Sequence, residues 1–351
     1  MKEYKPKQTN ASMTVRYALM AVGVEAVCAY VLLHSVGYDV SVGRLSMLTV
    51  LYNVIAVVGR MPMSVFADRV SSKHTGVRLG TMLILIGYYL PVSFGVNFKV
   101  VTLALGSCIF HSFAASQITR DANGRSTGIA LFLAGSTLGL ALTAFAPFLG
   151  HIGAILMTIC AIPDDNSPNE SPSVLKNGSA PSGGGFFAAI LLLITAYMLI
   201  FYEFSSFSFP WNTFFKTQLV TSVAIAAGRA LGGIISDRIG RGMTVICSIA
   251  SGTALICFCS GSRALGTLGL LLLSMSLAPL FSAVQQHFPA HGGFVFAVFS
   301  TAAYFGQELT FYAPMKKEWQ VLVVALAVIL AVTVSELPRT VRALKRREVS
   351  K

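Results

Sequence analysis

Long apolar segments recur along the whole chain and alternate with short polar turns. Each segment is roughly 17–25 residues long, which is the length of α-helix that crosses the hydrocarbon core of a bilayer. The shortest, 147–162, lies between two prolines, and we include it because an even number of spans places both chain ends on the same side. The pattern predicts an all-α polytopic membrane protein with twelve transmembrane helices, at residues 15–36, 45–66, 78–96, 98–117, 126–146, 147–162, 186–204, 213–236, 243–261, 264–283, 292–311 and 319–337.

The composition agrees with this pattern. Hydrophobic residues make up 54% of the 351 residues and charged residues only 11%, which is outside the usual range of soluble domains. All six cysteines fall within predicted spans, and none has the spacing of a zinc site or a redox motif. We therefore expect reduced packing cysteines, and neither a metal nor any other cofactor.

The positive charge gives the orientation in the membrane. The chain has a net charge of +12. With twelve spans, eighteen basic residues fall on the side of the two chain ends and six on the other side. Because basic loops stay in the cytoplasm, we expect both termini to be cytoplasmic, with the chain in the cell (inner) membrane. The basic residues are dispersed over short loops, which argues against nucleic-acid binding.

A charged turn occurs twice, at matching points of the two halves of the chain. The first copy is Gly59–Arg69 and the second is Gly228–Arg238. In each copy a Gly-Arg pair lies nine residues before an Asp-Arg pair, and the copies are 169 residues apart. This shared spacing indicates an internal duplication.

The repeated turn resembles the signature loop of the major facilitator superfamily of transporters, whose usual form is Gly-x-x-x-Asp-Arg-x-Gly-Arg. The second copy matches it in full, whereas the first has Ser64 and Ser71 at glycine positions. The resemblance implies two pseudo-symmetric six-helix halves and a conformational latch at these turns. The latch residues that it implies are Asp68, Arg69, Gly233, Asp237, Arg238, Gly240 and Arg241. The pairs Tyr52-Asn53 and Phe110-His111 are further similar to a bacterial branch of the superfamily near the fosmidomycin-resistance exporters.

Residues 163–185 interrupt the apolar pattern with proline, glycine, serine and acidic residues. Such a composition cannot bury a core and is typical of a flexible linker, here on the cytoplasmic side. It separates an N-terminal six-helix half, 1–162, from a C-terminal half, 186–337. Residues 338–351 form a basic cytoplasmic tail.

Ionisable residues inside predicted spans are the candidates for function, because their burial in a membrane is costly. Glu25 lies about 15 Å into the first span and is either a proton carrier, a substrate contact or a structural partner of an arginine. Arg60 lies at a similar depth and is its possible partner, with Asn53 two helical turns away. His111 is either a proton relay or a hydrogen-bonded interior residue. Arg229 matches Arg60 in the second half, and either binds an anionic group or extends to the lipid head groups.

These features favour a secondary active transporter that moves a small organic solute by alternating access, with protons as the coupling ion. We find no phosphate-binding loop for ATP and no constellation of catalytic side chains, so we do not expect an enzyme. The expected partners are the small-molecule substrate, protons and membrane lipids, and we expect a monomer. The alternative is a membrane sensor or assembly protein that keeps the fold without transporting.

Overall fold

The computed structural model describes residues 11–161 and 215–312, apart from Ser71, Asn123 and His287, and in addition Thr195 and Trp211. The predicted linker, the basic tail and the spans 186–204 and 319–337 lie outside these residues, except for Thr195. All regular structure in the described part of the chain is helical.

The N-terminal bundle follows the predicted spans. Its elements are α1 (Ala11–Tyr30), η1 (Val31–Val36), α2 (Val42–Asn53), η2 (Val54–Val58), α3 (Arg60–Arg69), α4 (Lys73–Tyr89), η3 (Val92–Phe94), α5 (Val96–Asp121), α6 (Thr127–Phe145) and α7 (Leu149–Ala161). The third predicted span, 78–96, differs most from its helix, α4. The helix starts earlier because its first turn is polar, and it ends before Pro91, whose ring disfavours a helical conformation at the preceding residue.

The C-terminal bundle is described from its second to its fifth predicted span. It contains α9 (Phe215–Ile239), α10 (Arg241–Cys259), α11 (Arg263–Met275), α12 (Leu277–Gln285) and α13 (Gly292–Tyr312). Across both bundles, seven helical segments of the described residues are long and apolar enough to cross a membrane. The predicted all-α polytopic fold is confirmed for these residues.

Three of the spans are interrupted: α1 passes into the π-helical η1 at Val31, and a proline accounts for each of the other two breaks. Pro62 is the third residue of α3, and η2, a π-helical segment, ends at Val58. Pro279 is the third residue of α12, and α11 ends at Met275. In both cases the helix breaks four residues before the proline, because proline has no N–H for that carbonyl and its ring collides with it.

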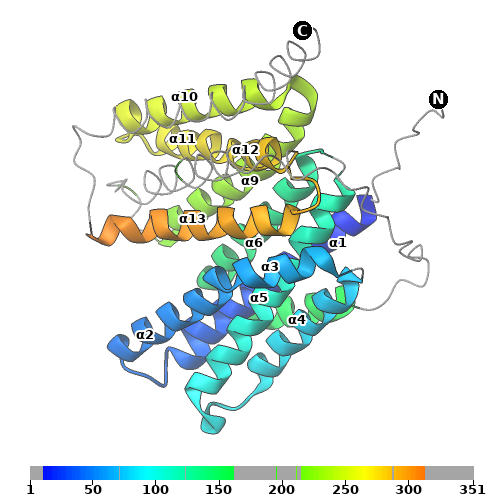
Figure 1. Cartoon of the computed structure of the whole chain (residues 1–351). Helices are drawn as coiled ribbons and strands as arrows, with labels where there is room; N and C mark the ends of the chain where they lie inside the picture. Colours follow the sequence, from blue (N-terminus) through cyan, green and yellow to red (C-terminus); the bar gives the residue numbers. More distant parts are fainter. Residues whose placement is uncertain are drawn as a thin grey trace, which may run out of the picture.

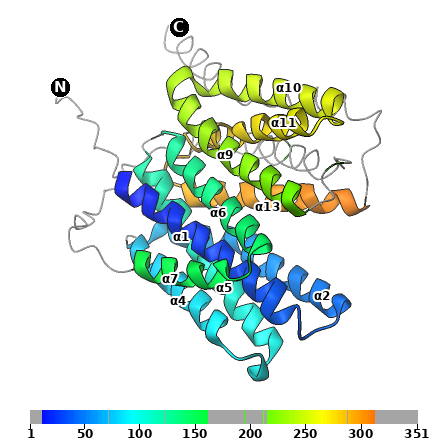
Figure 2. The same cartoon turned by 180° about the vertical axis from the view of Figure 1, so that it is seen from behind.

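The two bundles meet mainly along five helices. In the N-terminal bundle α1 packs on α6 and α7, and α4 packs on α5. Across the boundary α6 packs on α9, while α13 packs on α3 and α5 (Figures 1 and 2). The main contacts between the bundles therefore form two groups, α6 with α9, and α13 with α3 and α5.

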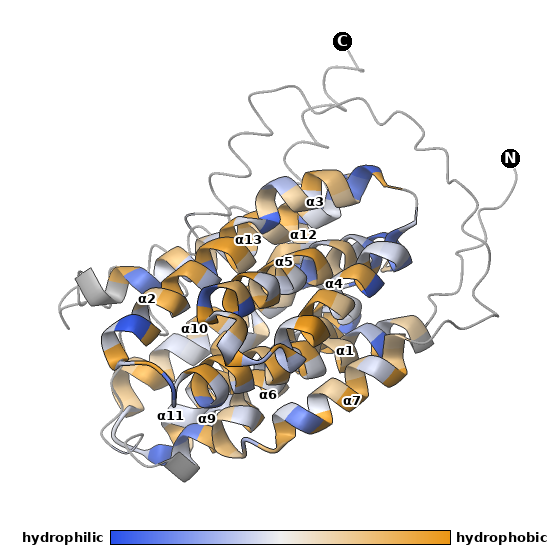
Figure 3. Ribbon diagram, turned by 90° about the horizontal axis from the view of Figure 1, so that it is seen from below, coloured by the Kyte–Doolittle hydropathy of each residue, from blue (hydrophilic) through white to orange (hydrophobic). Residues whose placement is uncertain are grey.

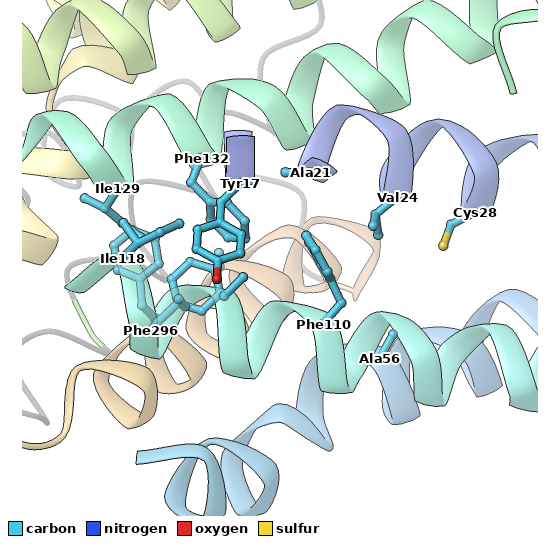
Figure 4. Packing of buried hydrophobic residues seen from close by; sticks show 14 of the residues in the cluster. Tyr17, Ala21, Val24, Cys28, Ala56, Phe110, Ile118, Ile129, Phe132 and Phe296 are labelled. Carbon is cyan, nitrogen blue, oxygen red and sulfur yellow. The ribbon is translucent and has the colours of Figure 1, made fainter. Parts of the chain in front are cut away.

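Aromatic side chains fill the core between the bundles. Phe132 of α6 and Phe296 of α13 are buried, with ring centroids 5.8 Å apart. Phe110 of α5 lies 6.2 Å from Phe132, and Phe281 of α12 lies 6.2 Å from Phe296. Figure 4 shows Phe110 pointing from α5 towards α1. This chain of rings joins four helices of both bundles into one core.

The outer surface is apolar. Large hydrophobic side chains are exposed along the helices, including Met82 of α4, Ile159 of α7 and Met243 of α10. Figure 3 shows hydrophobic residues along most ribbons and hydrophilic ones at the end of α3. A water-soluble protein rarely exposes apolar area on this scale, whereas lipid tails cover it at no cost.

Candidate functional site

A carboxylate and an imidazole meet inside the N-terminal bundle. Glu25 of α1 and His111 of α5 lie 3.1 Å apart, measured from Oε1 to Nε2. The His111 side chain is 2% exposed, whereas that of Glu25 is 21% exposed. The imidazole is thus enclosed by protein, and the carboxylate still has an accessible side.

The hydrogen bonds of His111 restrict where its protons can be. Its Nδ1 lies 2.9 Å from the backbone carbonyl oxygen of Ser107, one helical turn earlier. Because a carbonyl only accepts, Nδ1 carries a hydrogen and donates it. The Nε2 atom and the Glu25 carboxylate then hold one proton between them, either as imidazolium with carboxylate or as imidazole with carboxylic acid. A proton between these two atoms would be shared by the imidazole and the carboxylate.

Two arginines lie within electrostatic reach of this pair. The charges of both Arg60 and Arg229 act on the Glu25 carboxylate. Arg60 is 8% exposed and its Nε has no hydrogen-bond partner among the described residues. No ion pair joins Arg60 to Glu25 in this part of the chain, so the partner of Glu25 is His111 and not the arginine expected from depth alone.

Arg229 of α9 connects the two bundles. Its Nη1 donates to Thr137 Oγ1 at 2.5 Å and to the Leu133 carbonyl at 3.4 Å, both on α6. The guanidinium therefore turns towards the opposite bundle, while its counterpart Arg60 is buried at the N-terminus of α3. We call Glu25, His111, Arg60 and Arg229 the central cluster.

Asn53 lies at the end of α2 and is half-buried. Its neighbour Tyr52 is 8% exposed and interacts with the side chains of Cys28 and Ser107. Tyr52 thus links α2 to α1 and α5 beside the pair. Ser107 and Tyr52 were not predicted as site residues, although the spacing of Ser107 one turn before His111 was a usable signal.

Asp68, at the end of α3, caps a helix of the opposite bundle. Its Oδ1 and Oδ2 accept the backbone N–H groups of Gly293 (3.0 Å) and Phe294 (2.9 Å) in the first turn of α13. The hydroxyl of Ser116 on α5 donates to Oδ1 at 2.6 Å. The carboxylate is 6% exposed and satisfies amides that have no partner within their own helix.

Asp237, at the end of α9, makes the mirror contact. Its Oδ1 accepts the N–H of Ser126 (2.8 Å), and its Oδ2 accepts the N–H (3.0 Å) and the hydroxyl (2.6 Å) of Thr127 at the start of α6. Each bundle thus extends one carboxylate onto a helix N-terminus of the other. We call these two contacts the latches, and the end of the molecule that carries them the latch end.

The other predicted latch residues divide into two groups. Arg241 lies between the bundles, because its Nε donates to Ser126 Oγ at 3.3 Å and its Nη2 to the Gly124 carbonyl. Arg69 and Arg238 are exposed, and no hydrogen bond or ion pair of theirs is present within the described ranges. The first copy of the turn has no arginine equivalent to Arg241, so the two latches differ in this contact.

Both predicted glycines have a geometric reason. A Cβ on Gly233 would lie 2.2 Å from the Cβ of Ala130 and 2.9 Å from the Ser126 carbonyl, so glycine allows α9 to approach α6. Gly240 has a φ of +98°, a backbone conformation that side chains disfavour. It turns the chain from α9 into α10 and thereby places Arg241.

The comparisons with known proteins bear on this arrangement. No family model matches the chain, and neither does any curated protein. Among solved structures it is similar to FucP, a major facilitator superfamily transporter in the outward conformation, with a TM-score of 0.69, 12% identity and coverage of 94% of this chain and 99% of that chain. The chain has the major facilitator superfamily fold. A second structure, of the E. coli fucose:proton symporter FucP, matches with a TM-score of 0.69, 11% identity and the same coverage.

A third neighbour extends the range of this fold. A bacterial homologue of the iron transporter ferroportin, in an outward-facing state, matches with a TM-score of 0.60, 15% identity and coverage of 94% and 98%. The major facilitator superfamily fold predicted from the repeated turn is thus confirmed. Within this fold the latches cross the boundary at α3–α13 and α6–α9, and the central cluster takes its residues from α1, α3, α5 and α9.

Proposed function

We propose that this chain is a secondary active transporter that moves a small organic solute across the cell membrane by alternating access. The observation that carries the proposal is the central cluster, in which a proton-holding pair and two arginines meet inside an apolar bundle. Ionisable groups at membrane depth are costly and persist where they bind or relay ions. We further propose that the chain acts as a monomer with both termini in the cytoplasm.

Alternating access would use the latches. Both contacts join one bundle to the other, so the bundles cannot separate at the latch end unless both carboxylates leave their helices. Two of the neighbours in this fold are described as outward conformations, which supports the proposal that the structure represents the state closed on the cytoplasmic side. On this view the latch end is cytoplasmic, in agreement with the predicted orientation.

Proton coupling would use Glu25 and His111. The pair holds one proton in the closed state, and the accessible side of Glu25 allows exchange with the solvent or with substrate. One of the neighbours is a fucose:proton symporter, which supports protons as the coupling ion. Tyr52 lies in the same region, and we propose that it and Asn53 are the neutral groups available to a bound solute.

The substrate class follows from Arg60. A buried guanidinium without a partner in the described residues favours an anion, because carboxylate or phosphate binds its fork through two charge-assisted hydrogen bonds. Arg229 would supply a second positive charge from the opposite bundle. We propose a small organic anion, which would also connect the two bundles when bound.

Arg60→Lys tests this substrate class. Lysine keeps the charge but cannot reproduce the two-pronged contact, so the affinity for an anionic substrate should fall at least tenfold, or about 1.4 kcal/mol. Binding is measured by calorimetry on purified protein. Arg44→Lys, an exposed position at the start of α2, is the matched control and should leave the affinity unchanged. An unaltered affinity in Arg60→Lys, or a substrate that is not an anion, would assign a structural role to Arg60.

Transport itself is tested in proteoliposomes loaded with a pH-sensitive dye. Small organic anions are added one at a time, together with fucose and iron as the solutes suggested by the neighbours. We expect at least one anion to move protons with it and to accumulate along an imposed pH gradient. Solutes that bind and stabilise the protein but never cross the membrane would instead support a sensor.

A further inference from the structure

A pocket opens at the latch end of the N-terminal bundle, away from the central cluster. It lies between the first turns of α1 and α4 and the last turn of α7. Its cavity volume is small, about 30 Å³, and the space around it opens to solvent. Neither the latches nor the central cluster contributes a lining residue, so transport does not account for it.

The polar side of the pocket is positively charged. Arg16, His74 and Arg78 line it, and no acidic side chain does so among the described residues. Arg16 Nε donates to the carbonyl of Cys160 at 2.5 Å, which fixes its guanidinium to the end of α7. The hydroxyl of Tyr17 lies 2.8 Å from His74 Nδ1 and holds the imidazole in place. His74 and Arg78 belong to the first turns of α4, where the helix dipole adds further positive potential.

The remaining wall is apolar, and the three helices that form it carry exposed apolar side chains next in sequence to the lining residues. Met13 and Met20 of α1 line the pocket and are buried. Directly beside the lining residues, Val15 of α1, Leu79 of α4 and Ile159 of α7 are exposed by 49%, 50% and 60%. All three helices lie next to each other in Figure 2. A ligand held by the arginines would therefore extend along an apolar face formed by α1, α4 and α7.

We propose that this pocket binds the phosphate of an anionic membrane phospholipid. Arg16 and Arg78 would contact the phosphodiester oxygens, His74 would face the head group, and the acyl chains would follow the apolar face. A soluble phosphate would use only the basic side. The combination of a basic rim with an adjoining lipid-facing surface therefore assigns the lipid, independently of which solute the protein transports.

The test uses the purified full chain in non-ionic detergent and native mass spectrometry. The probes are dioleoylphosphatidylglycerol, dioleoylphosphatidylcholine and inorganic phosphate. We expect the phosphatidylglycerol to bind at least tenfold more tightly than the phosphatidylcholine. Arg78→Gln should remove this difference, and Arg78→Lys should retain part of it. Arg120→Gln removes the same charge from an exposed position in the last turn of α5 and should behave as the wild type.

Several outcomes would overturn the proposal. Equal binding of the two lipids would show that the pocket does not recognise the charge of the head group. An equal loss of phosphatidylglycerol binding in Arg78→Gln and Arg120→Gln would show that binding depends only on the net charge of the protein. Binding of inorganic phosphate that depends on Arg78 and competes with the lipid would assign the pocket to a soluble anion. Arg78 is exposed, so its variants should unfold at the wild-type temperature when no lipid is present. If Arg78→Gln nevertheless unfolds at a lower temperature, Arg78→Lys gives an independent measurement of lipid binding.

Discussion

Asp68→Asn should open the latch end, raising the open-to-closed ratio roughly 30-fold. The carboxylate accepts two backbone N–H groups of α13 and one serine hydroxyl at 2.6–3.0 Å. Asparagine has only one carbonyl oxygen, so its NH₂ group would face one of the two backbone N–H groups of α13 that the carboxylate now accepts. It also lacks the negative charge that interacts with the helix dipole. Charge-assisted hydrogen bonds contribute about 1.5–3 kcal/mol each, so a net loss of about 2 kcal/mol is expected.

Spin labels on the two bundles measure this change. Arg120 of α5 and Met243 of α10 are exposed and belong to different bundles near the latch end, and the distance between labels there should lengthen in Asp68→Asn. Asp237→Asn should have a smaller effect, because Asp237 is exposed and water replaces part of what is lost. Asp39→Asn, an exposed carboxylate in the loop after η1, is the matched control. An unchanged distance distribution in Asp68→Asn would show that the contact does not hold the bundles together.

Much of the fold could be predicted from the sequence, because span length and proline position act locally. The apolar runs located the spans within the described residues, and the sequence position of Pro62 is consistent with the break that the structure shows. The start of α4 was misplaced because its first turn, with Lys73 and His74, is polar. Hydropathy identifies only the apolar part of a helix. It does not detect polar turns that extend the helix into the head-group region.

The site was only partly visible in the sequence. The repeated turn indicated Asp68 and Asp237, but not the backbone amides that they bind, because amides of a distant helix leave no sequence pattern. Depth placed Glu25 level with Arg60, whereas the structure pairs it with His111. Position along a helix axis can be counted from the sequence. The rotation of each helix, which decides what a side chain meets, depends on the packing of all its neighbours.

Glu25→Gln should lower proton-driven accumulation of substrate at least tenfold. It should leave the exchange of substrate across the membrane largely intact. Glutamine fits the same space and can hydrogen bond to His111 Nε2, so the bundle should fold and bind solute. It cannot take up or release a proton, and the shared proton of the pair is lost as a transported species. The two activities are measured separately in proteoliposomes, as uptake along an imposed pH gradient and as counterflow with substrate on both sides.

The controls separate a proton site from general damage. Glu308→Gln makes the same chemical change on α13, at a half-exposed position near the end of that helix away from the latch, and should keep both activities. His111→Asn removes the other member of the pair and should resemble Glu25→Gln, since either loss leaves one group without its partner. If Glu25→Gln accumulates substrate with the wild-type dependence on pH, protons do not couple through this pair. Loss of accumulation and counterflow together would instead make Glu25 a substrate contact, because exchange needs binding but no net proton movement.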